Sequence, residues 1–556
     1  MTTLKIRAAI ALSLLAFIPA MAQMDNVIDV EHVYKPEIKD ANKISIQPEV
    51  KTTTVNRSPV DYDLTPVTVK HYTFTPVWAV KGDDAYKSAP RRFVTFGGGN
   101  EGNILTRGAV GLELNEKNQL DFDLGLRGHN AKVEHSDIED KDWKSRFYSA
   151  SASANYMHKL SSASSLFVKA AYESQVYNYQ QSLSDGSPAM PTDKQHNTLA
   201  SVSAGVTPYR TGNLTIGGEA GYKLFRQKYL TTFDDKCSEN LLSSNISAAY
   251  KFGSASSIGL GLSFVSTSYS DGIDGYSNIA LRPHYLWSND KMGIKAGLYI
   301  GSLGIAPDMS ITYHLRPSID IYADLTGGDV VATGTFRALT AASPYWALVS
   351  TSSIVDYDSK VKMKQQFNQL SARAGLRMQP LAGMKIDVNA GYELAEDRME
   401  LMPVYMDTPH NLYAATFFAD GNRFFLNANV SYDYKDRLSV TLANQFNAWS
   451  IDNNDIATED VLWRPVVDLD WEATIRIIGG LRASTDFRLQ TFKEAKGDAY
   501  SRPATTNLGA TLSYTLDRLP LTLYVKGNNL LNQKYDSYFG YKAPGINIIA
   551  GASFTF

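Results

Sequence analysis

The sequence of 556 residues has one cysteine, Cys237, and no apolar run long enough for a membrane-spanning helix after its N-terminal stretch. One thiol cannot form an internal disulfide, so no disulfides staple the fold. A spanning helix needs about 20 apolar residues, so helical spans are excluded. An excess of one charge is also missing, because 54 Lys and Arg residues balance 57 Asp and Glu residues. This balance argues against a nucleic-acid partner, which needs a basic surface.

Patterns typical of catalytic and metal sites are missing too. The nine histidines show no H-x-x-x-H spacing, and no G-x-S-x-G nucleophile elbow is present. Residues 97–102 fit G-x-G-x-x-G, but a strand-like alternation follows where a dinucleotide site needs a helix. We therefore expect no cofactor, no metal and no enzymatic activity. A Ser/His pair on one wall, as in barrel lipases, stays open as an alternative.

The first 22 residues have the pattern of a secretory signal peptide. Lys5 and Arg7 form a basic start, residues 8–18 are mostly apolar, and Ala20-Met21-Ala22 fits a small-residue cleavage site. The apolar stretch is too short to span a bilayer. The sequence therefore predicts an exported chain whose mature form begins at Gln23.

From about residue 91 to the end, apolar and polar residues alternate. Many alternating segments have about 10 to 14 residues, enough for a tilted strand to cross a bilayer, whereas a soluble sandwich has shorter and fewer strands. Such strands have one apolar face. The residues predicted to face lipid include Leu120, Phe122, Leu124, Ile258, Leu260, Leu262, Leu508, Leu512, Leu519, Leu521 and Leu523.

The connections alternate between short and long. Short turns are predicted at 116–117, 161–164, 211–213, 253–254, 289–290, 316–317, 382–383, 435–437, 479–480 and 517–518, and long loops at 131–143, 178–196, 325–364, 395–411, 449–463 and 530–545. This asymmetry is typical of outer-membrane barrels, whose short turns are periplasmic. The predicted fold is all-β: a transmembrane antiparallel outer-membrane β-barrel of about 22 strands over 91–556. The count requires one long strand from Leu412 to Asp433, interrupted near Asp420-Gly421.

Residues 23–90 have little periodicity and are rich in proline. The prolines are Pro36, Pro48, Pro59, Pro66, Pro76 and Pro90. Proline favours extended backbone and disrupts helices and central strands. We therefore expect an extended N-terminal tail, in the periplasm or along the lumen, and no plug domain.

The C-terminal stretch resembles the end of TonB-dependent receptor barrels. It contains Asn529-Leu530-Leu531-Asn532-Gln533-Lys534-Tyr535, then Pro544-Gly545 and a final strand. The family has Asn-Leu-Phe-Asp-x-x-Tyr there, so Leu531 and Asn532 depart from its pattern. The family's barrels have 22 strands, and its folded plug carries a glycine-rich Arg-Gly-Gly pattern that residues 23–90 lack. The resemblance thus implies a plugless relative located in the outer membrane.

Two terminal segments suggest contacts with other components of the cell. Phe554 and Phe556 end the closing strand and resemble the signal that the outer-membrane insertion machinery reads. We expect this machinery and outer-membrane lipid as partners. Near the mature N-terminus, Val27-Ile28-Asp29-Val30 has two interpretations, a short TonB-contact box or an ordinary part of the extended tail.

The long loop 325–364 is apolar and aromatic in its middle, around Phe336, Arg337, Tyr345 and Trp346. Long loops are often functional. One interpretation is a short helix folded into the mouth as a pore constriction, and the other is a cap packed on the outer rim.

Two functions follow from a wide barrel without a plug. The first is passage or uptake of a solute across the outer membrane, because a barrel of this size encloses a channel unless something fills it. The alternative is a structural subunit of an outer-membrane protein-insertion or surface-export complex, with a periplasmic or surface lipoprotein as partner.

Overall fold

The computed structural model describes residues 92–556 except 135–141, 162–163, 179–193, 229–235, 271–272, 317, 331–332, 343–345, 348–362, 406–411, 453–463, 494–501 and 539–540. The predicted signal peptide and tail therefore lie outside the described residues, and so do Val27, Ile28, Asp29, Val30 and Tyr345. The first described strand begins at Arg92.

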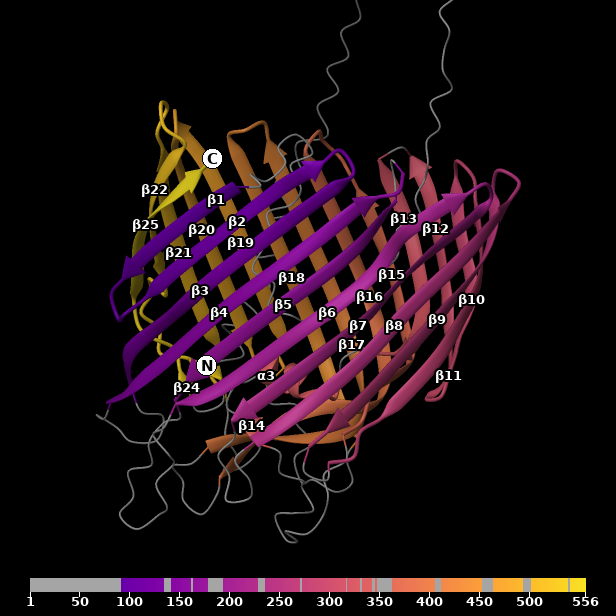
Figure 1. The fold of residues 1–556 in the computed structure, drawn as a ribbon, viewed down its shortest axis with the longest axis horizontal. Helices are drawn as coiled ribbons and strands as arrows, with labels where there is room; N and C mark the ends of the chain where they lie inside the picture. The colour runs from indigo at the N-terminus through magenta and orange to yellow at the C-terminus, as the bar shows by residue number, and fades with distance from the viewer. Residues whose placement is uncertain are drawn as a thin grey trace, which may run out of the picture. The chain divides into compact units, whose positions relative to one another are not determined.

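Long strands form nearly all of the described chain (Figure 1). The wall consists of β1 (Arg92–Gly99), β2 (Ile104–Asn115), β3 (Asn118–Glu134), β4 (Asp142–Lys159), β5 (Ser165–Tyr177), β6 (Gln195–Thr211), β7 (Leu214–Lys228), β8 (Lys236–Phe252), β9 (Ser256–Tyr269), β10 (Ser277–Ser288), β11 (Met292–Gly301), β12 (Gly304–Arg316), β13 (Ile319–Asp329), β15 (Phe367–Met378), β16 (Met384–Tyr405), β17 (Leu412–Tyr434), β18 (Leu438–Asp452), β19 (Val467–Ile478), β20 (Leu481–Thr491), β21 (Thr505–Thr515), β22 (Leu521–Asn528) and β25 (Asn547–Thr555). Three short strands, β14 (Trp346–Ala347), β23 (Asp536–Tyr538) and β24 (Tyr541–Lys542), and the helix α3 (Phe336–Ala342) lie in the loops.

The wall closes on itself as a barrel of 22 antiparallel strands within the described residues, which confirms the predicted fold class and strand count. The first strand pairs with the last, from Phe93 opposite Thr555 to Gly99 opposite Ile549. Because the wall is closed, it has no unpaired strand edge among the described residues. An open edge would expose unpaired backbone N–H and C=O groups to hydrocarbon, which is energetically costly. The predicted short turns all fall between wall strands at one rim, the rim where β1 begins and β25 ends.

The apolar face of the strands points outward. Leu124 is 61% exposed, Leu260 48% and Leu512 51%, whereas Ser263 on the opposite face of β9 is 9% exposed. The remaining residues of the predicted lipid-facing set lie on the same strand faces or, for Leu519, in the exposed turn before β22. The outer surface of the barrel is therefore the lipid-facing one.

Replacing Leu260 by Arg should destabilise the barrel by about 2–4 kcal/mol, because a cation near the middle of the bilayer loses its hydration. The loss is measured as a lower folding yield in lipid vesicles and as weaker heat-modifiability on a gel. Ser263→Arg on the lumen face of the same strand is the control. An equal loss in both variants would contradict the assignment of faces.

The structure corrects the sequence prediction at β16 and β17. Residues 395–411 were expected to be a loop, but pairing continues to Tyr405 opposite Leu412. The expected interruption in β17 at Asp420-Gly421 is absent, and the irregularity lies on β16 instead, between Ala395 and Arg398. Two residues of β16 there oppose one residue of β17, which is a β-bulge. The charged run in β16 therefore bends the hairpin rather than ending it.

Candidate functional site

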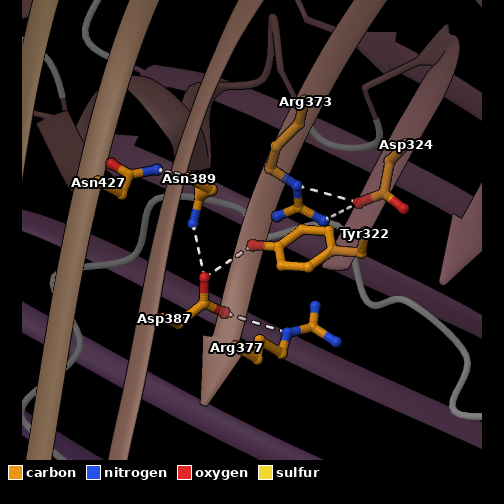
Figure 2. A network of polar contacts seen from close by, with 7 residues as sticks. All are labelled: Tyr322, Asp324, Arg373, Arg377, Asp387, Asn389 and Asn427. Atoms are coloured by element: carbon orange, nitrogen blue, oxygen red, sulfur yellow. Dashed lines mark hydrogen bonds and ion pairs between the residues drawn. The ribbon is translucent and has the colours of Figure 1, made fainter. Parts of the chain in front are cut away.

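The lumen face of β13, β15, β16 and β17 carries a network of paired polar side chains (Figure 2). Tyr322 is 2% exposed and donates from its hydroxyl to Asp387 Oδ1 at 2.7 Å. The other carboxylate oxygen of Asp387 accepts from Arg377 Nε at 3.1 Å. The guanidinium of Arg377 also lies 4.1 Å from the centre of the Tyr322 ring. Ile321 on the opposite face is 48% exposed to the outside, so Tyr322 points inward.

The same network extends along the wall in both directions. Arg373 donates from Nε to Asp324 at 3.0 Å, and Asn389 donates to Asp387 at 3.0 Å. Asn427 donates in turn to Asn389, also at 3.0 Å. These groups satisfy one another across four strands, so this part of the wall is a rigid polar surface.

A second charged group lies at the bulge of β16, near the long-loop end. Glu400 is 3% exposed and accepts from Arg464 Nε at 2.8 Å with each of its oxygens. Arg398 Nε lies 3.2 Å from the same carboxylate. The guanidinium carbons of Arg398, Arg423 and Arg464 lie 4.4, 5.1 and 5.1 Å from the ring centre of Trp449. These contacts hold the far part of the β16–β17 hairpin against β18 and the segment before β19.

The helix α3 is fixed to the lumen face of β8 and β9. Glu239 accepts from the backbone N–H of Phe336 at 2.5 Å, at the first residue of the helix. Tyr269 donates to the carbonyl of Gly334 at 2.8 Å, and Tyr276 donates to the carbonyl of Thr333 at 3.0 Å. Burial raises the pKa of the Tyr276 hydroxyl, so it stays protonated and keeps its role as a donor.

An apolar cluster around α3 joins strands that lie far apart around the wall. Phe336 and Leu339 are 0% exposed and pack with Phe225 of β7. The rings of Phe225 and Phe336 have centroids 6.3 Å apart. Met399 of β16 and Phe418 of β17 pack against the same cluster. In Figure 1 the orange ends of these two strands bend across the lower end of the barrel, where α3 lies. Helix and hairpin together therefore reach across the long-loop mouth.

The last long loop, between β22 and β25, folds onto the opposite part of the same mouth. Lys534 Nζ lies 2.8 Å from Glu134 Oε2 of β3. The ring of Tyr541 meets Trp143 of β4 edge to face, with centroids 5.7 Å apart. Between these two contacts along the loop, the carbonyl of Asp536 accepts from Arg502 Nη2 at 2.9 Å. This loop bridges β3 and β4 to the segment before β21.

The C-terminal motif has a structural role at the base of that loop. Asn529 is 3% exposed and donates to the carbonyls of Gln533 and Pro544, each at 3.0 Å. Asn529 and Asn532 both have a φ of 49°, a conformation that asparagine adopts more readily than most residues. Asn532 Oδ1 accepts from the backbone of Ile546 at 3.3 Å, which an Asp at this position could also do. The motif thus ties the two sides of the loop together.

The residues singled out from the sequence fall in different places. Phe336 and Arg337 begin α3, with Phe336 buried in the cluster and Arg337 exposed. Trp346 lies in β14, which pairs with β17 in parallel through Trp346 and Ala414. Phe554 lies in β25, and the backbone N–H of Phe556 donates to the carbonyl of Arg92 at 3.0 Å.

Sequence reasoning named Phe336 but none of the wall residues that anchor α3. Glu239 and Phe336 are 97 positions apart, and Tyr322 and Asp387 are 65 positions apart. A partial signal existed, because polar residues recur on the lumen-facing positions of strands with an apolar outer face. No motif spacing shows which of these residues meet.

Among the described residues, no group of three or more His, Cys, Asp or Glu side chains is arranged to hold a metal ion. In that part of the chain, no helix is long and apolar enough to cross a membrane.

No family model matches the sequence, and no curated protein matches it by sequence. Solved structures do match by fold. The ferric yersiniabactin uptake receptor FyuA from Yersinia pestis matches with a TM-score of 0.60 at 12% identity over 84% of this chain and 80% of FyuA. The ferric-catecholate import receptor Fiu from K12 E. coli matches with 0.60 at 11% identity, covering 84% and 82%. The copper transporter OprC matches with 0.59 at 10% identity, covering 84% and 80%.

These neighbours are TonB-dependent receptors of the outer membrane. The described part of the chain therefore has the barrel fold of that class, and the outer membrane is its location. The names of these neighbours describe uptake, import and copper transport, and the likeness of this chain to them is one of fold.

Proposed function

We propose that this protein is a gated, non-enzymatic outer-membrane channel for a solute, and that α3 together with the β16–β17 hairpin forms its gate. The single observation that carries this proposal is the apolar cluster that runs from Phe225 through Phe336 to Met399 and Phe418. It joins separate parts of the wall across the long-loop mouth. An apolar contact of this kind opens without breaking covalent structure, so it suits a gate.

Deletion of residues 330–350 tests the gate. The deletion should raise single-channel conductance in planar bilayers and sensitivity of cells to large antibiotics. A deletion of 180–192 in another long loop is the control, and it should change neither. If conductance is negligible before and after removal of 330–350, the gate lies elsewhere or the lumen is filled by the tail or by a partner.

A second function, a structural subunit of an outer-membrane protein-insertion or surface-export complex, is favoured by the wall network. Tyr322, Asp324, Arg373, Arg377 and Asp387 engage one another rather than presenting isolated charges to the lumen. A rigid wall whose polar groups engage one another suits a scaffold. Purification from native membranes in mild detergent separates the two functions. A stoichiometric lipoprotein or insertion-machinery subunit supports the scaffold, and a lone conducting barrel supports the channel.

Export by a cleaved signal peptide is part of the proposed function. N-terminal sequencing of protein from the outer membrane should give Gln23 as the first residue. Retention of Lys5 or Arg7 in the membrane-inserted protein would contradict this export route.

Coupling to TonB through Val27-Ile28-Asp29-Val30 is a separate proposal, since a proline-rich tail also accounts for this segment. If the box is used, substitution of Ile28 by Pro should abolish solute uptake while leaving conductance in bilayers unchanged.

A further inference from the structure

A row of basic side chains projects from the outer surface of the barrel near its long-loop end. Lys144 and Arg146 of β4 and Arg226 of β7 are exposed. Their chain neighbours Ser145 and Phe225 are 6% and 3% exposed, because they face the lumen side. Successive side chains of a strand point to opposite faces, so the three cations point outward.

Lys194, directly before β6, continues the row. Lys194 is exposed, and the following residue, Gln195, is 0% exposed. The strands that carry or adjoin the row, β4 to β7, are consecutive in the wall. The four cations therefore belong to one sector of the outer surface. We refer to Lys144, Arg146, Lys194 and Arg226 as the basic row.

The basic row lies at the level of lipid headgroups. Going from Arg146 towards the short-turn rim, Tyr148 is the next outward-facing residue of β4. Going from Arg226 in the same direction, Tyr222 is the second outward-facing residue of β7. Tyr222 is 41% exposed and donates to Asn240 on the outer face of β8 at 2.6 Å. Outward-facing tyrosines gather at the membrane–water interface. With a rise of about 3.3 Å per residue and a tilt of about 45°, the Cα atoms of Arg146 and Arg226 lie roughly 5 and 9 Å beyond those of the tyrosines, measured along the membrane normal.

The charge of the row lacks compensation among the described residues. Lys132 of β3 lies directly opposite Lys144, and like charges in cross-strand pairs repel. Asp142 is the outward-facing carboxylate of β4 at this level, and its Oδ2 lies 2.5 Å from Lys132 Nζ. Within the described part of the chain, no ion pair involves any of the four cations of the row. An anion from outside the barrel would relieve this excess.

We propose that the basic row binds the phosphate groups of anionic lipid headgroups in the outer leaflet of the membrane. Arginine presents its N–H groups as a fork that matches phosphate oxygens. The aliphatic stems of Lys and Arg lie along apolar surface while their charged ends reach the headgroup layer. Charge attraction to an anionic leaflet adds to both effects. This site is on the outer surface and is independent of the proposed gate in the lumen.

The test uses the full barrel in detergent, titrated with phosphorylated lipid A and with its dephosphorylated form. A variant with Lys144→Gln, Arg146→Gln, Lys194→Gln and Arg226→Gln should bind the phosphorylated form at least tenfold more weakly than the unaltered protein. The matched control is Lys117→Gln, Lys159→Gln, Lys251→Gln and Lys291→Gln, which removes four exposed cations at the short-turn rim. The control should bind as the unaltered protein does. Heat-modifiability on a gel verifies that both variants fold.

Three results would overturn the proposal. The first is equal affinity of the unaltered protein for phosphorylated and dephosphorylated lipid A, which would also arise if acidic residues of loop 135–141 neutralise the row. The second is an equal loss of affinity in the control variant. The third is competition by inorganic phosphate at the concentration of the lipid, which would indicate a site for free phosphate.

Discussion

Replacement of Phe336 and Leu339 by serine is expected to turn a closed barrel into one that conducts ions steadily in a planar bilayer. Both side chains are 0% exposed and pack between β7 and the β16–β17 hairpin. Removal of one buried Phe side chain should destabilise the closed state by about 3–5 kcal/mol. Since about 1.4 kcal/mol changes an equilibrium constant tenfold, the ratio of open to closed barrels should rise by about a hundredfold or more. Single-channel recording measures the fraction of time in the conducting state.

Arg337→Ser in the same helix is the control for this double variant, because Arg337 is exposed. It should leave the closed state unchanged. Hydrogen exchange of the α3 amides shows separately whether the helix has left the wall. A helix that is released while conductance stays negligible would show that α3 is not the barrier, and the scaffold function would then be favoured.

The barrel was predictable from the sequence because its physical requirements are local. A strand that faces lipid must be apolar at every second residue, and the turn that ends it must be short on one rim, so this alternation can be read without knowledge of distant residues. Ile258, Leu260 and Leu262 show it within one strand. The lumen-facing residues follow no such rule. Tyr322 and Asp387 meet only because β15 lies between β13 and β16 in register.

The β16–β17 hairpin shows where local reasoning fails. A charged run such as Glu396-Asp397-Arg398 is typical of a loop, yet here Asp397 adopts a φ of 48° in a bulge and the strand continues. Charge is tolerated in a strand when a partner compensates it. For Asp397 that partner is Lys364, and for Glu400, further along the same strand, it is Arg464, which lies 64 positions away, so no window of the sequence reveals it.

Replacement of Glu400 by Gln should release the far half of this hairpin. Glu400 is 3% exposed, and removal of one member of a buried ion pair typically costs about 3–5 kcal/mol. Arg464 is 31% exposed and keeps part of its hydration, so we expect about 3 kcal/mol. Hydrogen exchange of the amides of 398–405 should accelerate by roughly a hundredfold, since these amides exchange through local opening. The apolar contact of Met399 with the α3 cluster should weaken with it, and channel opening should rise in the same variant.

The control is Asp397→Asn, at the bulge itself. Its partner is Lys364 at 2.5 Å, with side-chain exposures of 37% for Asp397 and 44% for Lys364. Exposed pairs of this kind contribute about 0–1 kcal/mol, and asparagine tolerates the positive φ, so exchange should change by no more than a few-fold. Equal acceleration in both variants would mean that charge at the bulge matters but burial does not. If Glu400→Gln accelerates exchange without opening the channel, the hairpin moves independently of α3, and the gate consists of α3 alone.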